Sequence, residues 1–379
     1  MDFKLTEEQE LIRANIREFV QQYLDPIAAK IDEESRHPAE VIEKLAEKGW
    51  MGMPYPQEYG GAGTDFLTYA IVVEEISRSC AATGFIFSCH TGLGTGPIYY
   101  FGNEEQKRKY LVPLCKGEKL GAFALTEPGA GTDVNAATTT AVLDGDGYVL
   151  NGTKTFISNA PVADIFVVFA KTDPAGGAKA MSAFIVTKDM PGFRVGEHFM
   201  KMGIRASQTA EVILKDCRVP KENLLGKEGD GLKIAMSSLN DGRIGIAAQA
   251  VGITQAALDE SISYSKQRVQ FGKPIARQQA IQWMIADMAT ELQAARFLTY
   301  YAAYLKDQGL PYTKEASMAK LFASEVAMRS ASKAVQIHGG YGYIKGFKVE
   351  RLLRDAKITE IYEGTSEAQR MVIAGNLLR

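Results

Sequence analysis

Apolar residues recur at helical spacing through the first 120 residues of the chain. Thr6 and Gln9 have the spacing of a capping box, which predicts a helix that begins there. Further helical patterns cover 38–48 and 66–79. The intervening segments 58–65 and 92–97 are rich in chain breakers and predict loops or helix ends. The N-terminal third is therefore expected to be helical.

From about residue 120 the pattern changes to short runs rich in Val, Ile, Thr and Phe, which are typical of strands. Such runs cover 141–143, 148–150, 165–170 and 183–187. The sequence Asp-Gly-Asp-Gly at 144–147 predicts a hairpin turn, because glycine readily adopts the positive φ angles of a tight reversal. We expect a small antiparallel barrel or sandwich in the middle of the chain.

Helical periodicity returns after Gly231 and lasts to the end, over 232–267, 276–306, 314–338 and 366–378. The apolar stretch 244–258 is shorter than the roughly 20 residues that cross a bilayer, so it predicts a buried helix. The order of helical, β and helical segments predicts an α+β chain of three domains. We set their bounds at 1–120, 121–230 and 231–379.

Composition narrows the class of protein. The chain has 379 residues, with 43 Lys and Arg against 45 Asp and Glu, and this balance lacks the basic field of a nucleic-acid binder. Four cysteines at positions 80, 89, 115 and 217 form no CxxC pair, which argues against a disulfide framework or a zinc site. The first residues have neither the apolar core of a signal peptide nor the Arg-rich character of a transit peptide. We expect a cytoplasmic protein with no metal, no nucleic-acid partner and no membrane span.

Common catalytic signatures are missing: there is no GxGxxG unit, Walker loop, HExxH or GxSxG. The stretch 123–133, FALTEPGAGTD, has glycines that let backbone amides approach a planar or anionic ligand, although an ordinary loop explains it equally well. In the segment 151–158, Phe156 and Ser158 share one strand face. An aromatic plate beside a hydroxyl suits a flavin ring, and a plain cross-strand packing pair is the alternative.

The segment 357–367, KITEIYEGTSE, predicts an extended stretch that ends at Gly364 and a helix that begins with a capping box of Ser366 and Gln369. The free amides of such a helix start can hold a pyrophosphate. Glu363 has apolar neighbours that would raise its pKa toward the range of a general base, whereas the bland interpretation is an exposed loop carboxylate. The glycines at 339–342 either present amides to a phosphate or end a helix, and His338 has no companion metal ligand.

Four segments of the chain together resemble motifs of the acyl-CoA dehydrogenase family, and of its short-chain, butyryl-CoA type branch. They are LTEPGAGTD at 125–133, KQRVQFGKPI at 266–275, QIHGGYGY at 336–343 and IYEGTSEAQR at 361–370, and the resemblance covers essentially the whole chain. It implies an N-terminal α-helical domain, a middle β domain and a C-terminal four-helix bundle. It also implies a homotetramer, a dimer of dimers, that shares FAD between neighbouring subunits.

The resemblance assigns site residues. On the cofactor side it implies flavin-ring contacts from Phe123, Leu125, Thr126, Phe156 and Ser158, contacts to other parts of FAD from Thr132, Thr365 and Glu367, and contacts to a neighbouring subunit's FAD from Arg268, Phe271, Gln279, Gln336, Gly339 and Gly340. On the substrate side it implies Thr132, Asn240, Asp241 and Arg243 along the CoA arm, Gly364 beside the thioester, and Phe85, Cys89 and Tyr362 around the acyl group. Relatives usually carry Asp where this chain has Asn240, and some branches keep their base at the position of Gly242. Glu363 is thus the one family-matched base.

The activity implied is FAD-dependent α,β-dehydrogenation of a short acyl-CoA to the 2-enoyl-CoA, as in fatty-acid β-oxidation. Glu363 would remove the α proton, FAD would accept the hydride, and an electron-transfer flavoprotein would take the electrons. Small residues at 92, 94 and 95 leave room for a branched or cyclic acyl group, whereas Phe85 could keep the pocket short. The alternatives are an acyl-CoA oxidase, an enoyl-CoA reductase working in reverse with the flavoprotein, and a non-enzymatic helical assembly protein that binds acyl-CoA.

Overall fold

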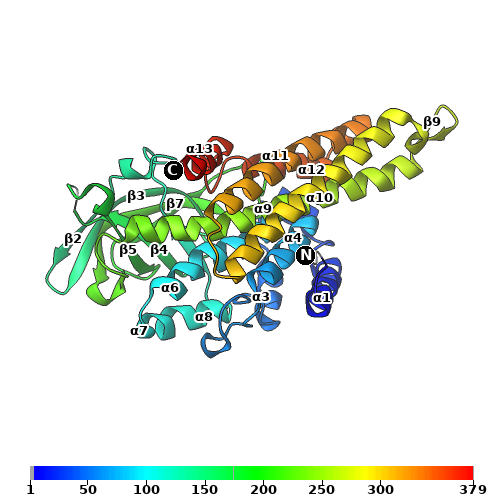
Figure 1. Ribbon diagram of the computed structural model, residues 1–379. Helices are drawn as coiled ribbons and strands as arrows, with labels where there is room; N and C mark the ends of the chain where they lie inside the picture. Colours follow the sequence, from blue (N-terminus) through cyan, green and yellow to red (C-terminus); the bar gives the residue numbers. More distant parts are fainter. Residues whose placement is uncertain (1–3, 174, 379) are drawn as a thin grey trace.

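The computed structural model describes residues 4–173 and 175–378. A sheet lies at one end of the molecule, and long C-terminal helices extend from it toward the other end (Figure 1). The N-terminal helices are α1 (Glu7–Tyr23), α2 (Ala28–Glu33), α3 (Ala39–Glu47), α4 (Phe66–Ser79), α5 (Ala81–Ser88), α6 (Gly96–Phe101), α7 (Glu104–Gln106) and α8 (Val112–Cys115). Thr6 and Gln9 form the predicted capping box of α1, and Asp65 caps α4 by accepting a hydrogen bond from the backbone N–H of Thr68. Both predicted helix starts are confirmed.

The prediction of a loop or helix end at 92–97 is wrong. A π-helix, Cys89–Thr95, joins α5 to α6 without a break. Its glycines serve close packing: a Cβ at Gly94 would lie 2.7 Å from the carbonyl carbon of Gly121. The small residue at 94 is therefore explained by contact with a strand backbone rather than by a wide pocket.

The middle of the chain forms one eight-stranded sheet. Its strands are β1 (Gly121–Ala124), β2 (Thr140–Asp144), β3 (Gly147–Ser158), β4 (Ile165–Lys171), β5 (Met181–Thr187), β6 (Phe193–His198), β7 (Thr209–Pro220) and β8 (Leu224–Leu225). They run in the order β6-β7-β3-β2-β4-β5-β8, and β1 pairs with β4. Asp144 pairs with Gly147 across the predicted hairpin turn, which is confirmed. Most pairs are antiparallel, but β4 runs parallel to both β1 and β2.

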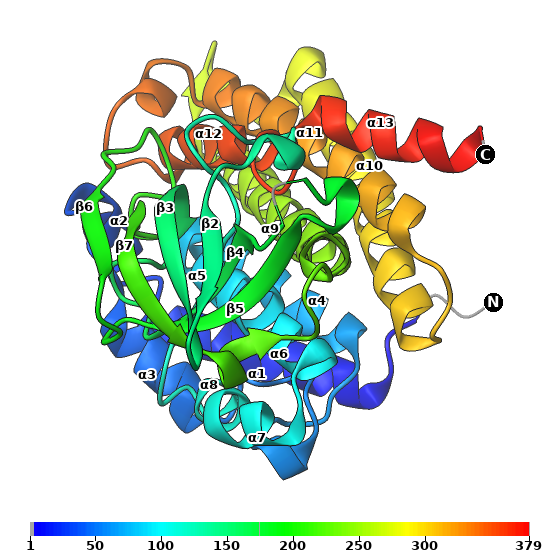
Figure 2. The ribbon, with the colours of Figure 1, turned by 90° about the vertical axis from the view of Figure 1, so that its left-hand side faces the viewer.

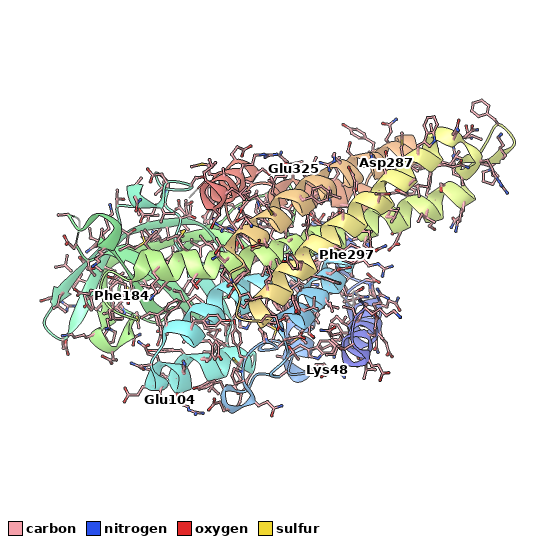
Figure 3. The ribbon with its side chains drawn as sticks, viewed as in Figure 1. Lys48, Glu104, Phe184, Asp287, Phe297 and Glu325 are labelled. Carbon is pink, nitrogen blue, oxygen red and sulfur yellow. The ribbon has the colours of Figure 1, made fainter. Side chains whose placement is uncertain are left out.

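The sheet divides into two halves that enclose a shared core. A single residue pair, Thr140 with Lys171, joins β2 to β4. Apolar side chains of β3 and β7 on one half pack in the same cluster as Phe166 and Phe184 on the other. Figure 3 marks Phe184 within this sheet. This packing fits the expected barrel or sandwich, and Figure 2 shows the sheet with N-terminal helices below it and C-terminal helices above.

Long helices dominate the C-terminal part. They are α9 (Gly231–Gln267), α10 (Gln279–Asp307) and α11 (Thr313–His338), followed by α12 (Lys348–Thr359) and α13 (Ser366–Leu377), and a small hairpin of β9 (Val269–Gln270) and β10 (Lys273–Pro274) links α9 to α10. The stretch 244–258 is buried within α9, as predicted, apart from the partly buried Gln255. Within the described ranges, no helix is both long and apolar enough to cross a membrane.

Candidate active site

Glu363 lies in the turn between α12 and α13 with its backbone in the left-handed region. Its φ is +52° and that of Gly364 is +93°, a conformation that a residue with a side chain adopts rarely. The side-chain amide of Gln369 donates to the carbonyl oxygens of Glu363 and Gly364 at 3.1 and 2.9 Å. Lys320 Nζ donates to the Gly364 carbonyl oxygen at 2.7 Å. Two donors from two helices thus hold this turn.

Two local predictions here are wrong. Residues 357–359 end helix α12 and 360–363 form a turn, so no extended stretch leads to Gly364. The cap of α13 is Thr365, whose hydroxyl accepts from the backbone N–H of Ala368 at 3.2 Å, one residue before the predicted Ser366. The expected partner Gln369 reaches back to the turn instead. Burial of Val349, Leu352 and Ala356 on one face of α12 favours the helix over the strand.

The carboxylate of Glu363 is shielded from solvent, and neither oxygen has a hydrogen-bond partner among the described residues. It lies over Gly242 of α9, where an added Cβ would overlap Oε2 and lie 2.8 Å from the carboxyl carbon. Burial raises the pKa of Glu363 to about 8, against the opposing charges of Lys320 and Arg243. A carboxylate with free lone pairs and a pKa in this range can act as a general base near neutral pH. The exposed-loop alternative is therefore wrong.

Aromatic rings form a wall beside the base. The rings of Phe85 and Tyr362 lie 4.5 Å apart, and Cys89 is buried on the following π-helix. The Tyr362 hydroxyl donates to the side-chain carbonyl oxygen of Gln249. The side-chain amide nitrogen of Gln249 in turn donates to the Ala81 carbonyl oxygen at 2.9 Å. The structure thus brings the three predicted acyl-group residues toward Glu363. Gln249 was not predicted, because no local motif marks a contact 113 residues away.

The predicted CoA-arm residues of α9 divide between two directions. Asn240 and Arg243 face α11: Arg243 Nη1 donates to Asn240 Oδ1 at 2.8 Å, and Asn240 Nδ2 donates to Thr313 Oγ1 at 3.0 Å. Asp241 is buried elsewhere, 2.5 Å from Lys306 Nζ and accepting from the Tyr312 hydroxyl at 2.6 Å. The carboxylate of Asp241 is already paired within the chain, so the structure does not support its prediction as a CoA ligand.

The predicted flavin-ring residues lie on β1 and β3. Phe123 packs on Phe169 with ring centroids 4.8 Å apart. On β3, a register irregularity between Lys154 and Ile157 leaves Phe156 with a φ of +57° and 66% exposed, while Ile157 is buried. Phe156 and partly exposed Ser158 therefore flank a core residue, as the strand pattern predicted.

Nearby, Thr132 and Glu367 are exposed, Leu125 is buried and Thr126 is partly buried. The Thr126 carbonyl accepts from the backbone N–H of Thr155, which ties the predicted ligand loop to the strand irregularity beside Phe156.

A buried ion pair that sequence reasoning missed anchors the 125–133 loop. Lys154 is fully buried, and its ammonium lies 2.6 Å from Glu127 Oε1 and 3.1 Å from the Leu125 carbonyl oxygen. Glu127 also accepts hydrogen bonds from the backbone N–H groups of Thr138 and Thr139. Burial opposes ionisation of Glu127, but Lys154 and these donors outweigh it and lower its pKa to about 2. The loop is thus fixed from beneath, which leaves its exposed glycines facing outward.

The remaining predicted cofactor residues lie far from Glu363. Figure 1 places the β9–β10 hairpin at the opposite end of the long helices from the sheet. A groove of about 1070 Å³ there is lined by Arg268, Phe271, Gly339 and Gly340, among others, while Gln279 and Gln336 are exposed nearby in the chain. Phe271 is 92% exposed. In the described part of the chain, no cluster of potential metal ligands occurs.

Comparison with known proteins gives matches along the whole chain. Three family models match consecutive segments: the acyl-CoA dehydrogenase N-terminal domain at 6–118, its middle domain at 122–217 and its C-terminal domain at 229–378. A short-chain specific acyl-CoA dehydrogenase of Clostridium acetobutylicum is 56% identical over 379 residues, which is 100% of both chains. An acryloyl-CoA reductase (NADH) of Anaerotignum propionicum is 53% identical and covers 100% of this chain and 96% of its own.

Solved structures agree with this fold over the full length. Butyryl-CoA dehydrogenase from Megasphaera elsdenii superposes with a TM-score of 0.98 at 48% identity, with 100% of both chains covered. A chain from a structure of the electron transferring flavoprotein of Acidaminococcus fermentans gives a TM-score of 0.99 at 53% identity, again with 100% of both covered. A structure from Bacillus anthracis complexed with FAD gives 0.94 at 39% identity, over 99% of this chain and 68% of that one.

Proposed function

The chain belongs to the acyl-CoA dehydrogenase family, and on that premise we propose that it oxidises a short acyl-CoA to the 2-enoyl-CoA with Glu363 as the base. The chain is an oxidoreductase of this family. The observation that carries the assignment of the base is the buried carboxylate of Glu363 over Gly242, which no residue of the described ranges hydrogen-bonds. In its ionised form it can accept a proton without first breaking a hydrogen bond to another described residue.

FAD is the cofactor, and the residues around the site fit it. Bound FAD supplies an electron acceptor for hydride, which side chains cannot provide. The exposed Phe156 ring, the partly exposed Ser158 and the anchored glycine loop at 125–133 would hold the flavin ring. At the start of α13, the backbone N–H of Ser366 already donates to the Glu360 carbonyl and that of Ala368 to the Thr365 hydroxyl, so these two are not free for an anionic part of the cofactor.

A short acyl group is the substrate that we propose. The tilted, closely packed rings of Phe85 and Tyr362 and the hydrogen bonds from Tyr362 through Gln249 to Ala81 support this. Lengthening the acyl chain past this wall would require breaking buried hydrogen bonds, which is costly without replacement partners. The names of the butyryl-CoA and short-chain specific relatives agree with a short substrate.

We also propose that the electrons pass to an electron-transfer flavoprotein, as the similarity to a chain in such a structure suggests. A homotetramer, a dimer of dimers, is proposed because one chain carries its predicted cofactor residues at two distant ends (Figure 1). A neighbouring copy could complete each site. A cytoplasmic location is proposed as well, and the four free, buried cysteines are consistent with it.

The test combines the absorbance spectrum of the purified protein with one substitution. The wild type should be yellow and should bleach when butyryl-CoA is added without oxygen. Glu363→Gln should stay yellow and lose at least about 100-fold in bleaching rate, since general base catalysis contributes on that order or more. A colourless wild type, or near wild-type bleaching by Glu363→Gln, would contradict the proposal.

The reverse reaction is a second candidate, because a relative of 53% identity is an acryloyl-CoA reductase. The same base, once protonated, could return a proton to the carbon next to the thioester carbonyl. Dithionite-reduced protein mixed with acryloyl-CoA or crotonyl-CoA would test this direction. Rapid peroxide formation with butyryl-CoA in air would instead indicate an oxidase.

A further inference from the structure

Lys320 is a charged residue of the site that the chemistry proposed above does not use. Its side chain is fully buried on α11, and its one hydrogen bond among the described contacts is the donation to the Gly364 carbonyl at 2.7 Å. Burying an ammonium is costly unless it is well paired. The position therefore calls for a role beyond packing.

The first effect of Lys320 is on the backbone. Gly364 O accepts from both Lys320 Nζ and Gln369 Nε2 while the backbone at Glu363 is left-handed. Such a conformation persists only where surrounding contacts impose it. The direction of the Glu363 side chain toward Gly242 thus depends on this pair of donors.

The second effect is electrostatic. Two buried cations, Lys320 and Arg243, act on Glu363 from α11 and α9. The nearby Asp241 does not offset them, because it pairs with Lys306. Arg243 donates to two neutral groups, Asn240 Oδ1 and Ser317 Oγ, and its Nε finds no partner in the part of the chain that the structure describes. The charge around the base is therefore net positive.

The other titratable groups that act on Glu363 are neutral. They are Tyr69 on α4, Cys89 on the π-helix and the adjacent Tyr362, and burial raises the pKa of each. Lys320 in turn faces Glu363 and Arg243 and, more weakly, Glu360 and Glu367; burial lowers its pKa to about 8. The cations are thus the main groups that oppose the effect of burial on the base.

We propose that Lys320 is a positioning residue that acts through Glu363: its ammonium holds the Gly364 carbonyl and keeps a buried positive charge beside the carboxylate. The charge favours the ionised form of Glu363, and the hydrogen bond keeps that form aimed over Gly242. The proposal depends on the proposed function in one respect, the assignment of Glu363 as the base.

The experiment titrates the Glu363 carboxyl by infrared difference spectroscopy of the holoenzyme, with Glu363→Gln used to assign the band. Lys320→Met removes both the charge and the donor, and should raise the titration midpoint by about one pH unit or more. Asn240→Asp adds a counter-charge to Arg243 without touching Gly364, and should also raise it. Gln369→Met removes a donor but no charge, and should lower kcat for butyryl-CoA while leaving the midpoint in place.

Two further variants serve as controls. Lys320→Arg keeps a charge and donors, and should restore the midpoint toward wild type. Lys333→Met removes a partly exposed lysine on the same helix, which pairs with Asp287, and should change neither midpoint nor kcat. In each variant, the apparent pKa at which kcat/KM for butyryl-CoA rises with pH should shift by the same amount as the midpoint of the carboxyl titration.

A midpoint that is unchanged in Lys320→Met overturns the proposal. If Lys320→Met does not fold, Lys320→Gln, which removes the charge but keeps a donor, decides in its place: an upward shift of the midpoint supports the proposal and no shift overturns it. The titration needs no substrate, so a chain that failed to oxidise any acyl-CoA would refute the proposed function and leave this result standing.

Discussion

The carboxylate of Glu363 and the backbone of Gly242 occupy adjoining space so closely that residue 242 cannot carry a side chain without displacing the carboxylate. The two residues are 121 positions apart in sequence, on α9 and on the turn before α13. The absence of one side chain therefore defines where the proposed base can lie.

Gly242→Ala should move the carboxylate and lower kcat by about 100-fold, since a displacement of about 1 Å at a reacting group can cost that much. Steady-state turnover of butyryl-CoA measures the effect. The matched control is Gly375→Ala on α13, where an added Cβ meets nothing within 4 Å. Equal activity of the two alanine variants would contradict the proposed geometry.

The raised pKa of Glu363 predicts how stability depends on pH. Folding raises this pKa from 4.5 to about 8, so the folded chain binds the proton more tightly than the unfolded chain. The stabilising contribution is complete below pH 4.5 and is lost as pH rises through about 8. Glu363→Gln lacks this dependence, so the variant should gain stability relative to wild type between pH 5 and 9, roughly the range of the shift. Urea unfolding at several pH values tests it; parallel curves for the two proteins would be evidence against a buried carboxylate.

Lys154→Met should release the 125–133 loop, because Glu127 would be left as an unpaired buried charge. Removing one partner of a buried pair costs about 3–5 kcal/mol. We expect a loss of unfolding free energy of this size and a faster release of FAD. Flavin fluorescence measures the release. Adding Glu127→Gln to Lys154→Met should recover part of the stability, and no recovery would mean that the charge of Glu127 is not what destabilises the single variant.

Gln249→Ala should widen the proposed acyl site. It removes the acceptor of the Tyr362 hydroxyl and the donor to Ala81, and it leaves space behind the ring. The ratio of kcat/KM for octanoyl-CoA to that for butyryl-CoA should rise at least about tenfold, since small changes in pocket volume alter discrimination on that scale. The control, Gln255→Ala, lies further along α9 and contacts Asp259 and Arg296 instead. A constant ratio in Gln249→Ala would mean that this wall does not limit chain length.

Local patterns predicted the long elements well and the site only in part. The helix 66–79 was predicted to the residue, because its helical pattern follows directly after the chain breakers at 58–65. The segment after Lys357 was wrongly predicted to be extended, because Ile358, Thr359 and Ile361 have strand propensity. Packing against the bundle imposes a helix to Thr359 and a turn after it. The domain bounds at 120 and 230 stay a prediction.

Contacts between distant residues account for most of what the sequence analysis missed. Lys154 lies 27 residues from Glu127 and Lys320 lies 44 residues from Gly364. From its neighbours in sequence, each of these two lysines would be expected to be solvent-exposed. Only the tertiary fold removes them from water and gives them a partner. Figure 3 labels two charged residues with a contrasting fate: Asp287 on α10 is exposed and Glu325 on α11 is partly exposed.

The close backbone contact between Gly94 and Gly121 limits how the substrate range of the protein can evolve. The π-helix beside the proposed acyl site and strand β1 beside the proposed flavin site touch backbone to backbone, with no side chain between them to absorb a change. Insertions or deletions in that helix would shift both walls together. New acyl preferences should therefore arise by exchange of side chains such as Gln249, and protein engineers would do well to leave the length of 89–95 unaltered.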